Sequence, residues 1–183
     1  MSFFYLFLFL LAIVIIWLVF TFNRLVVLRM RAREALSDVD VQLKRRFDLI
    51  PNLVETVKGY MEHERETLTK VTEARSQVAG GGNALERDKA ENALSNTLKT
   101  LFAVAEGYPD LKANANFLDL QRELADTENK IQASRRFYNT TTMELNTKIE
   151  TFPTNLLAGT LGFKKLEFFA AEEGERENIK VSF

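Results

Sequence analysis

The sequence predicts an all-α protein in which an N-terminal transmembrane helix is followed by an antiparallel long-helix bundle of three long helices plus a short fourth. The first observation behind this prediction is the absence of charged side chains between Ser2 and Asn23. The second is that apolar residues in the rest of the chain recur at mostly three-and-four spacing, the period of an amphipathic helix. Only 8 Gly and 3 Pro are spread over 183 residues, so long helices can form.

The N-terminal stretch FFYLFLFLLAIVIIWLVFTF has the composition of a membrane span. It supplies about 20 apolar residues, enough to cross a hydrocarbon core of about 30 Å as a helix. A cleaved signal peptide is the rival interpretation, but it needs a basic residue before a shorter apolar run and a small-residue cleavage site. Because the sequence has none of these, residues 1–23 are predicted to be a transmembrane anchor, and residues 24–183 a bundle with a C-terminal tail.

Basic residues follow the apolar stretch directly, and no acidic residue occurs before Glu34. These membrane-proximal basic residues are Arg24, Arg29, Arg31 and Arg33. Cytoplasmic flanks of membrane spans carry an excess of Lys and Arg, so we expect a single-pass protein with its N-terminus outside and its bundle in the cytoplasm. The same arginines either only set this orientation or also bind the head groups of anionic membrane lipid.

The soluble part is expected to begin with one long amphipathic helix whose apolar face continues to Val71. Pro51 lies inside this pattern and predicts a kink or a short break near Asp48 to Pro51. The glycines at positions 80–82 predict the end of the helix, with a left-handed C-terminal cap. A second helix is predicted from about Ala84 to Glu106, ending in a turn at residues 107–110.

The third predicted helix has an apolar residue at every seventh position, as in a coiled-coil seam. These residues are Phe117, Leu124, Ile131, Tyr138, Leu145 and Phe152, with Leu120, Thr127, Ser134 and Thr141 at the intermediate positions. The buried hydroxyls there need partners, often a carbonyl one turn back. Pro153 should end the helix, and a short fourth helix is expected from Asn155 to Leu161. Gly162 then opens a tail whose last residues are expected to be either an extended strip along the bundle or disordered.

The predicted helix lengths indicate self-association. At about 1.5 Å per residue, the cytoplasmic part of the first helix is about 65 Å long and the second about 35 Å. The second helix therefore cannot cover the first, and exposed apolar stripes usually mark contacts. We expect homo-oligomerisation through the membrane-proximal part of the first helix, with three candidate residues: Leu36, Val39 and Leu43.

No residue set of a known enzyme class is found in the sequence. The chain has no Cys, which excludes disulfides and thiolate chemistry. Its one histidine, His63 in MEHERE, lacks the second His of the zinc-protease pattern, because position 67 is Thr67. Glycine patterns for nucleotide binding and the GxSxG pattern are missing as well. We therefore predict no catalytic residue, no cofactor and no metal site.

Two basic clusters lie away from the membrane: Lys44, Arg45 and Arg46, and Arg135 with Arg136. Both are interpreted as salt-bridged helix surface, since charge runs on helices usually face solvent. They are also the most plausible interaction residues if partners exist. Nucleic acid is not an expected partner, because 24 basic residues balance 25 acidic ones and aromatic context is missing around the clusters.

Three long segments of the chain resemble the LemA family. They are DVQLKRRFDLIPNLVETVKGYMEHE, AEGYPDLKANANFLDLQRELADTENKIQASRRFYN and FPTNLLAGTLGF. The resemblance covers the chain from the anchor to the tail. It implies a bacterial membrane protein with an N-terminal span and a cytoplasmic bundle of long helices, and it supplies no catalytic residues. The string LIPN also has a folding interpretation, in which Pro51 sets a bend and Asn52 satisfies the carbonyls that the bend frees.

The leading hypothesis is a non-enzymatic, membrane-anchored scaffold or adaptor at the bacterial plasma membrane that self-associates through helical surfaces. The alternative is an accessory subunit of a membrane metalloprotease or another envelope quality-control machine, which the resemblance suggests. A third hypothesis, from another class, is a hydrolase with an unrecognised metal site. The expected partners are membrane lipid, further copies of the chain and a membrane protease.

Overall fold

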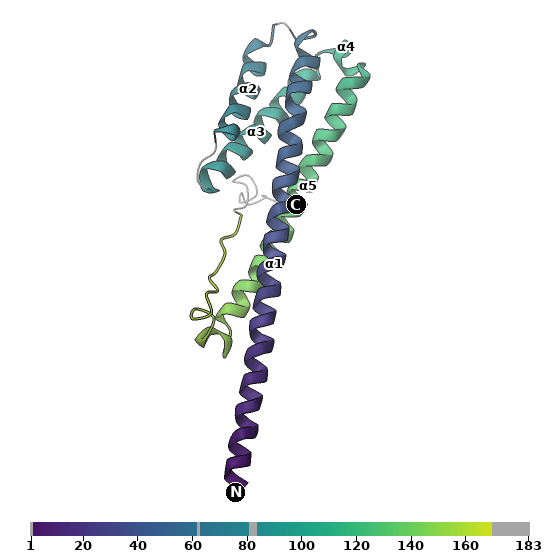
Figure 1. Ribbon diagram of the computed structural model, residues 1–183. Coiled ribbons are helices and arrows are strands. Elements are labelled where there is room, and N and C mark those ends of the chain that lie inside the picture. The colour runs from purple at the N-terminus through teal and green to yellow at the C-terminus, as the bar shows by residue number, and fades with distance from the viewer. Residues whose placement is uncertain (1, 62, 81–83, 170–183) are drawn as a thin grey trace, which may run out of the picture. The chain divides into compact units, whose positions relative to one another are not determined.

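The computed structural model describes residues 2–61, 63–80 and 84–169, and within these ranges it contains helices and no strand (Figure 1). The elements are α1 (Ser2–Lys58), α2 (Arg65–Ala79), α3 (Ala84–Ala105), α4 (Pro109–Lys112), α5 (Ala115–Glu150) and the 3-10 helix η1 (Thr154–Leu156). The predicted all-α class is therefore confirmed. The alternating residues of the tail, at positions 179–183, lie outside the described residues.

The chain divides into two compact units. The first comprises residues 1–39 and 134–168, and the second is built on residues 40–133. Helices α1 and α5 each contribute residues to both units.

The N-terminal part of α1 is long and apolar enough to cross a membrane. In the most apolar stretch of 18 residues of α1, no residue is buried within the protein. The side chains from Phe3 to Ile16 are exposed, although nearly all of them are large and apolar. Such a surface is stable only in an apolar surrounding, which a lipid bilayer supplies.

The core of the first unit joins α1, α5 and the segment that follows α5. It consists of Leu25, Leu28, Leu145, Ala158 and Phe163. The segment is held to α5 by the Asn146 side chain, whose Nδ2 donates to the Leu166 carbonyl (2.8 Å) and whose Oδ1 accepts from the Leu166 N–H (2.9 Å). This paired amide contact fixes the path of the chain after η1.

The second unit packs α2, α3, α5 and the C-terminal part of α1 around one core. Its buried side chains are Ile50, Leu53, Val57, Met61, Val71, Ala74, Leu94, Leu98, Leu101, Ala105, Leu111, Phe117 and Leu124. Helix α2 lies against α3 (Figure 1). The every-seventh residues of the third predicted helix are buried from Phe117 to Leu145, but Phe152 lies beyond the end of α5 and is exposed.

The first long helix ends at Lys58, so the prediction that it continues to Gly80 is wrong. The N–H groups of Tyr60 and Met61 both donate to the Val57 carbonyl (3.0 and 3.1 Å), which closes a turn, and Met61 is buried in it. The three-and-four pattern persists through this turn because α2 needs an apolar face of its own. Periodicity alone therefore gave no sign of the reversal.

Two other predicted helix boundaries agree with the structure, and one predicted helix does not. The end of a helix at Gly80 is confirmed. Gly80 itself is right-handed (φ −65°), and the other glycines of the predicted cap lie outside the described residues. The second predicted helix matches α3 to within one residue. The buried hydroxyls of Thr127 and Thr141 donate to carbonyls four and three residues back, as predicted (2.7 and 2.9 Å). A helix at 155–161 is replaced by η1 and turns.

Pro51 does not break α1. The carbonyl that Pro51 leaves without a donor accepts a hydrogen bond from a side chain of another helix. Proline has no N–H to donate to the carbonyl four residues back, which belongs to Phe47. Nε of Arg75, on α2, donates to this carbonyl at 3.2 Å, and the Arg75 guanidinium lies 3.9 Å from the centre of the Phe47 ring. The expected partner, Asn52, instead has its own carbonyl bonded by the Thr56 hydroxyl (2.8 Å).

Replacing Arg75 with Ala is expected to lower the free energy of unfolding by about 1–2 kcal/mol, since one hydrogen bond and one cation-π contact are lost. In a Pro51→Ala background the cost should be smaller, because the new N–H of Ala can donate to the Phe47 carbonyl. Denaturant unfolding of the four proteins of this double-mutant cycle, in detergent micelles, measures the difference. Equal costs in both backgrounds would show that Arg75 does not compensate for the proline.

Candidate functional site: a buried arginine cluster

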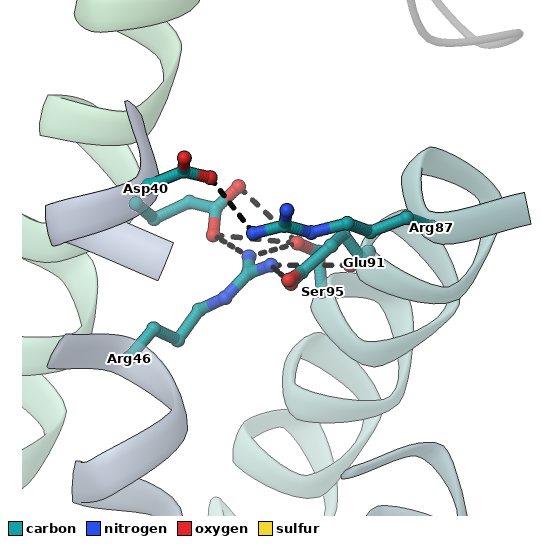
Figure 2. Close-up of polar contacts among 6 residues, drawn as sticks. Asp40, Arg46, Arg87, Glu91 and Ser95 are labelled. Carbon is teal, nitrogen blue, oxygen red and sulfur yellow. Dashed lines mark hydrogen bonds and ion pairs between the residues drawn. The ribbon is translucent and has the colours of Figure 1, made fainter. Parts of the chain in front are cut away.

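The most unusual polar feature of the second unit is an arginine buried among three helices. Arg46 of α1 is 1 % exposed, and it contacts Glu91 and Ser95 of α3 and Glu128 of α5. We call these four residues the Arg46 cluster. Figure 2 shows the Arg46 side chain extending from α1 towards α3, where Glu91 and Ser95 meet it.

The guanidinium is bonded on both of its terminal nitrogens. Nη1 donates to Ser95 Oγ and to Glu128 Oε2, both at 2.5 Å. Nη2 donates to the Glu91 carboxylate and also to the Glu91 main-chain carbonyl, at 3.3 Å. Glu91 is 3 % exposed, while Glu128 keeps partial contact with solvent. Two carboxylates therefore face one cation in a site that is largely dry.

Helical spacing explains how these polar residues reach the interior. Arg46 is three residues after Leu43 and four before Ile50, so it lies on the apolar face of α1. On α3, Glu91 and Ser95 are one turn apart and share a face with the buried Leu94 and Leu98. This spacing was available in the sequence. The run Lys44-Arg45-Arg46 hid it, because charge runs usually lie in solvent.

Two further ion pairs lie beside the cluster and nearer to solvent. Arg87 of α3 donates to Asp40 of α1 at 2.8 Å, as Figure 2 shows, and Arg45 of α1 lies 3.5 Å from Glu123 of α5. On α1 the acid Asp40 precedes the buried base Arg46. On α3 the base Arg87 precedes the buried acid Glu91. A shift of α3 by one turn would bring Arg87 towards Arg46, so like charges oppose that register.

A partly open cavity of about 220 Å³ adjoins the cluster. Arg46, Ser95 and Glu128 form part of its wall. The rest of the lining is mostly apolar and includes Leu98, Phe102 and Leu124. The cavity is therefore a gap in the bundle with one polar wall.

The cluster is suited to holding helices together rather than to proton transfer. Both carboxylates are engaged by the guanidinium, and a serine nucleophile needs an adjacent base such as histidine. The one histidine, His63, is exposed in the turn before α2. Across residues 2–61, 63–80 and 84–169, no three His, Cys, Asp or Glu side chains are grouped as metal ligands would be.

The predicted interaction residues differ in how far they are exposed to solvent. Lys44 and Arg45 are exposed, and Lys44 pairs with Asp48 at 3.2 Å. Arg46 was expected on the helix surface, and this is corrected: burial inside the bundle makes it unavailable to a partner. Arg136 is exposed and Arg135 half-buried.

The membrane-proximal basic residues also divide. Arg24, Arg31 and Arg33 are exposed. Arg29 is half-buried, and its guanidinium carbon lies 4.8 Å from the centre of the Phe163 ring. Three of the four arginines are thus available to solvent or lipid, while Arg29 also packs within the first unit.

Of the three residues predicted to drive self-association, two are already covered within the chain. Val39 and Leu43 are buried, and only Leu36, at 39 % exposure, remains accessible. The expectation that this face lacks an intramolecular partner is therefore wrong for Val39 and Leu43.

These features define a class of protein: a helical bundle on an apolar helix that can cross a membrane. The sequence profile of the LemA family matches residues 35–183, and the chain belongs to this family. Protein LemA of Metamycoplasma hominis is 30 % identical over 99 % of this chain and 84 % of its own length. Magnetosome protein MamQ 2 of Paramagnetospirillum magneticum is 28 % identical over 83 % of this chain, and the match spans 65 % of MamQ 2.

Removing the cation from the Arg46 cluster is expected to destabilise the second unit strongly. Arg46→Met leaves Glu91 as an uncompensated buried charge, for which about 3–5 kcal/mol is the usual cost. Arg45→Met removes the neighbouring exposed ion pair with Glu123 and should lower the free energy of unfolding by only about 0–1 kcal/mol. Adding Glu91→Leu to Arg46→Met should recover much of the loss. Thermal unfolding followed by circular dichroism tests this, and equal effects of Arg45→Met and Arg46→Met would contradict it.

Proposed function

We propose that this protein is a membrane-anchored, non-enzymatic scaffold or adaptor that presents a helical bundle at the cytoplasmic face of a bacterial plasma membrane. The observation that carries the proposal is the single helix α1. Its N-terminal part exposes an apolar surface, while its later residues belong to the buried cores of the bundle. One helix thus supplies both the anchor and part of the domain that is anchored.

The charge distribution supports the orientation. The span carries no charged side chain, and four arginines follow it within ten residues of Arg24. Residues of this kind concentrate on the cytoplasmic side. The relatives that are named magnetosome proteins agree with a role at a membrane.

The Arg46 cluster supports the non-enzymatic part of the proposal. Its charged groups bond one another within the bundle, and its serine has no histidine beside it among the described residues. A bundle held together in this way offers fixed helical surfaces. Binding through such surfaces is what a scaffold requires.

The orientation can be tested with single cysteines, because the chain has none of its own. Gln132→Cys places a thiol at an exposed site on α5, and Ser2→Cys places one before the span. In intact cells a membrane-impermeant maleimide should label position 2 and should label position 132 only after permeabilisation. Labelling of position 132 in intact cells would overturn the cytoplasmic placement of the bundle.

Self-association is proposed to use the exposed Leu36. Leu36→Cys with a bifunctional maleimide should give a dimer band several-fold stronger than Asp38→Cys, which is exposed on another face of α1, or the buried Val39→Cys. Monomer alone at every protein-to-lipid ratio would refute it.

Mass determination after mild-detergent purification separates the scaffold from the accessory-subunit alternative. A membrane protease that co-purifies in stoichiometric amount would favour the accessory subunit. A clean monomer would contradict the scaffold.

A further inference from the structure

We propose that residues 152–161, the segment that follows α5, form a second membrane contact that inserts into the lipid head-group region beside the span. The inference rests on the proposed function, because it takes the N-terminal part of α1 to be in a bilayer. It assigns a lipid surface as the partner of apolar side chains that the fold leaves exposed.

The first step concerns the position of the segment along α1. The Phe163 ring lies 5.8 Å from the ring of Phe22, and Ala158 shares a buried cluster with Leu25 and Leu28. Residues 3–22 of a helix span about 30 Å, the thickness of the hydrocarbon core, so Phe22 lies at its boundary. The segment therefore lies at the depth of the lipid head groups.

Burial along α1 supports the same depth. The side chains from Phe3 to Ile16 are exposed, but Trp17 and Leu18 are half-buried and Thr21 is buried. Coverage of α1 by the first unit thus begins inside the apolar stretch, before Phe22 is reached.

The second step concerns what the segment exposes. Phe152 is 79 % exposed, Leu156 67 % and Leu161 38 %. The sequence from Thr151 to Phe163 contains no charged residue, in a chain of which 27 % is charged. Large apolar side chains in an uncharged segment are costly in water, and they are stabilised when they enter the boundary between head groups and acyl chains.

The third step is that the segment is held in place. The Tyr138 hydroxyl donates to the Glu167 carbonyl at 3.1 Å, Lys165 pairs with Glu150, and Asn146 binds both main-chain groups of Leu166. The chain that follows the exposed apolar side chains is therefore fixed to α5, from which the segment itself extends.

Basic groups at the same level favour anionic head groups. Two basic residues, Arg24 and Lys148, and one acidic residue, Glu144, line one groove of the first unit, together with Thr147 and Thr151. Cations and hydroxyls close to an interface suit the phosphates of lipid head groups. Vesicles of phosphatidylethanolamine and phosphatidylglycerol are therefore the appropriate probe.

The test uses spin labels on single cysteines in the full chain, reconstituted in these vesicles. Labels at Phe152→Cys and Leu156→Cys should be several-fold less accessible to a water-soluble nickel complex than a label at Gln132→Cys, and more accessible to oxygen. Ile15→Cys, within the span, serves as the deep reference. The substitutions at 152 and 156 replace exposed side chains, so an unchanged melting temperature is expected.

The outcomes separate the two proposals. If position 15 is protected while 152 and 156 behave like 132, the interfacial contact is refuted and the anchor stands. If position 15 is accessible to nickel, the anchor fails and the interfacial contact with it. If 152 and 156 are protected but their spectra show dipolar broadening that disappears on dilution with unlabelled protein, another copy covers the segment and the lipid contact is refuted.

Discussion

The second unit depends on the burial of one charged side chain. Arg46 lies on the apolar face of α1, where a cation is tolerated only if its charge and its hydrogen bonds are met. The partners come from α3 and α5, which are separated from Arg46 by at least 45 residues along the chain. Three helices must therefore be correctly placed before this side chain can be buried, and hydrophobic packing alone imposes no such condition.

Pro51 imposes a similar requirement on a smaller scale. A proline inside a helix normally weakens it, because one carbonyl loses its donor. In this chain Arg75 of α2 donates to that carbonyl and stacks on the same residue's ring, so α1 continues to Lys58. In both places an arginine bonds groups on a neighbouring helix. A feature that would be unfavourable within one helix thereby becomes a contact between helices.

The sequence was most informative where a feature is local. The uncharged stretch identifies the apolar helix, Gly80 caps the end of α2, and the Phe-Leu-Ile-Tyr-Leu register identifies α5. It was misleading at Gly59 and Tyr60, where the apolar period continues across a reversal of the chain. It was also misleading at Arg46, whose three-and-four spacing from Leu43 and Ile50 was outweighed by the neighbouring basic residues.

The sequence by itself determined the class of the protein, the apolar helix that can span a membrane and most helix boundaries, because these follow from composition and from periods of a few residues. Only the tertiary structure decided which polar groups are buried and which apolar ones are left exposed. Those outcomes depend on which segments meet: Glu91 reaching Arg46, Arg75 reaching Phe47, and Phe163 reaching Phe22 while Phe152 and Leu156 stay uncovered. Pairings between distant segments leave no period in the sequence, so they could not be predicted from it.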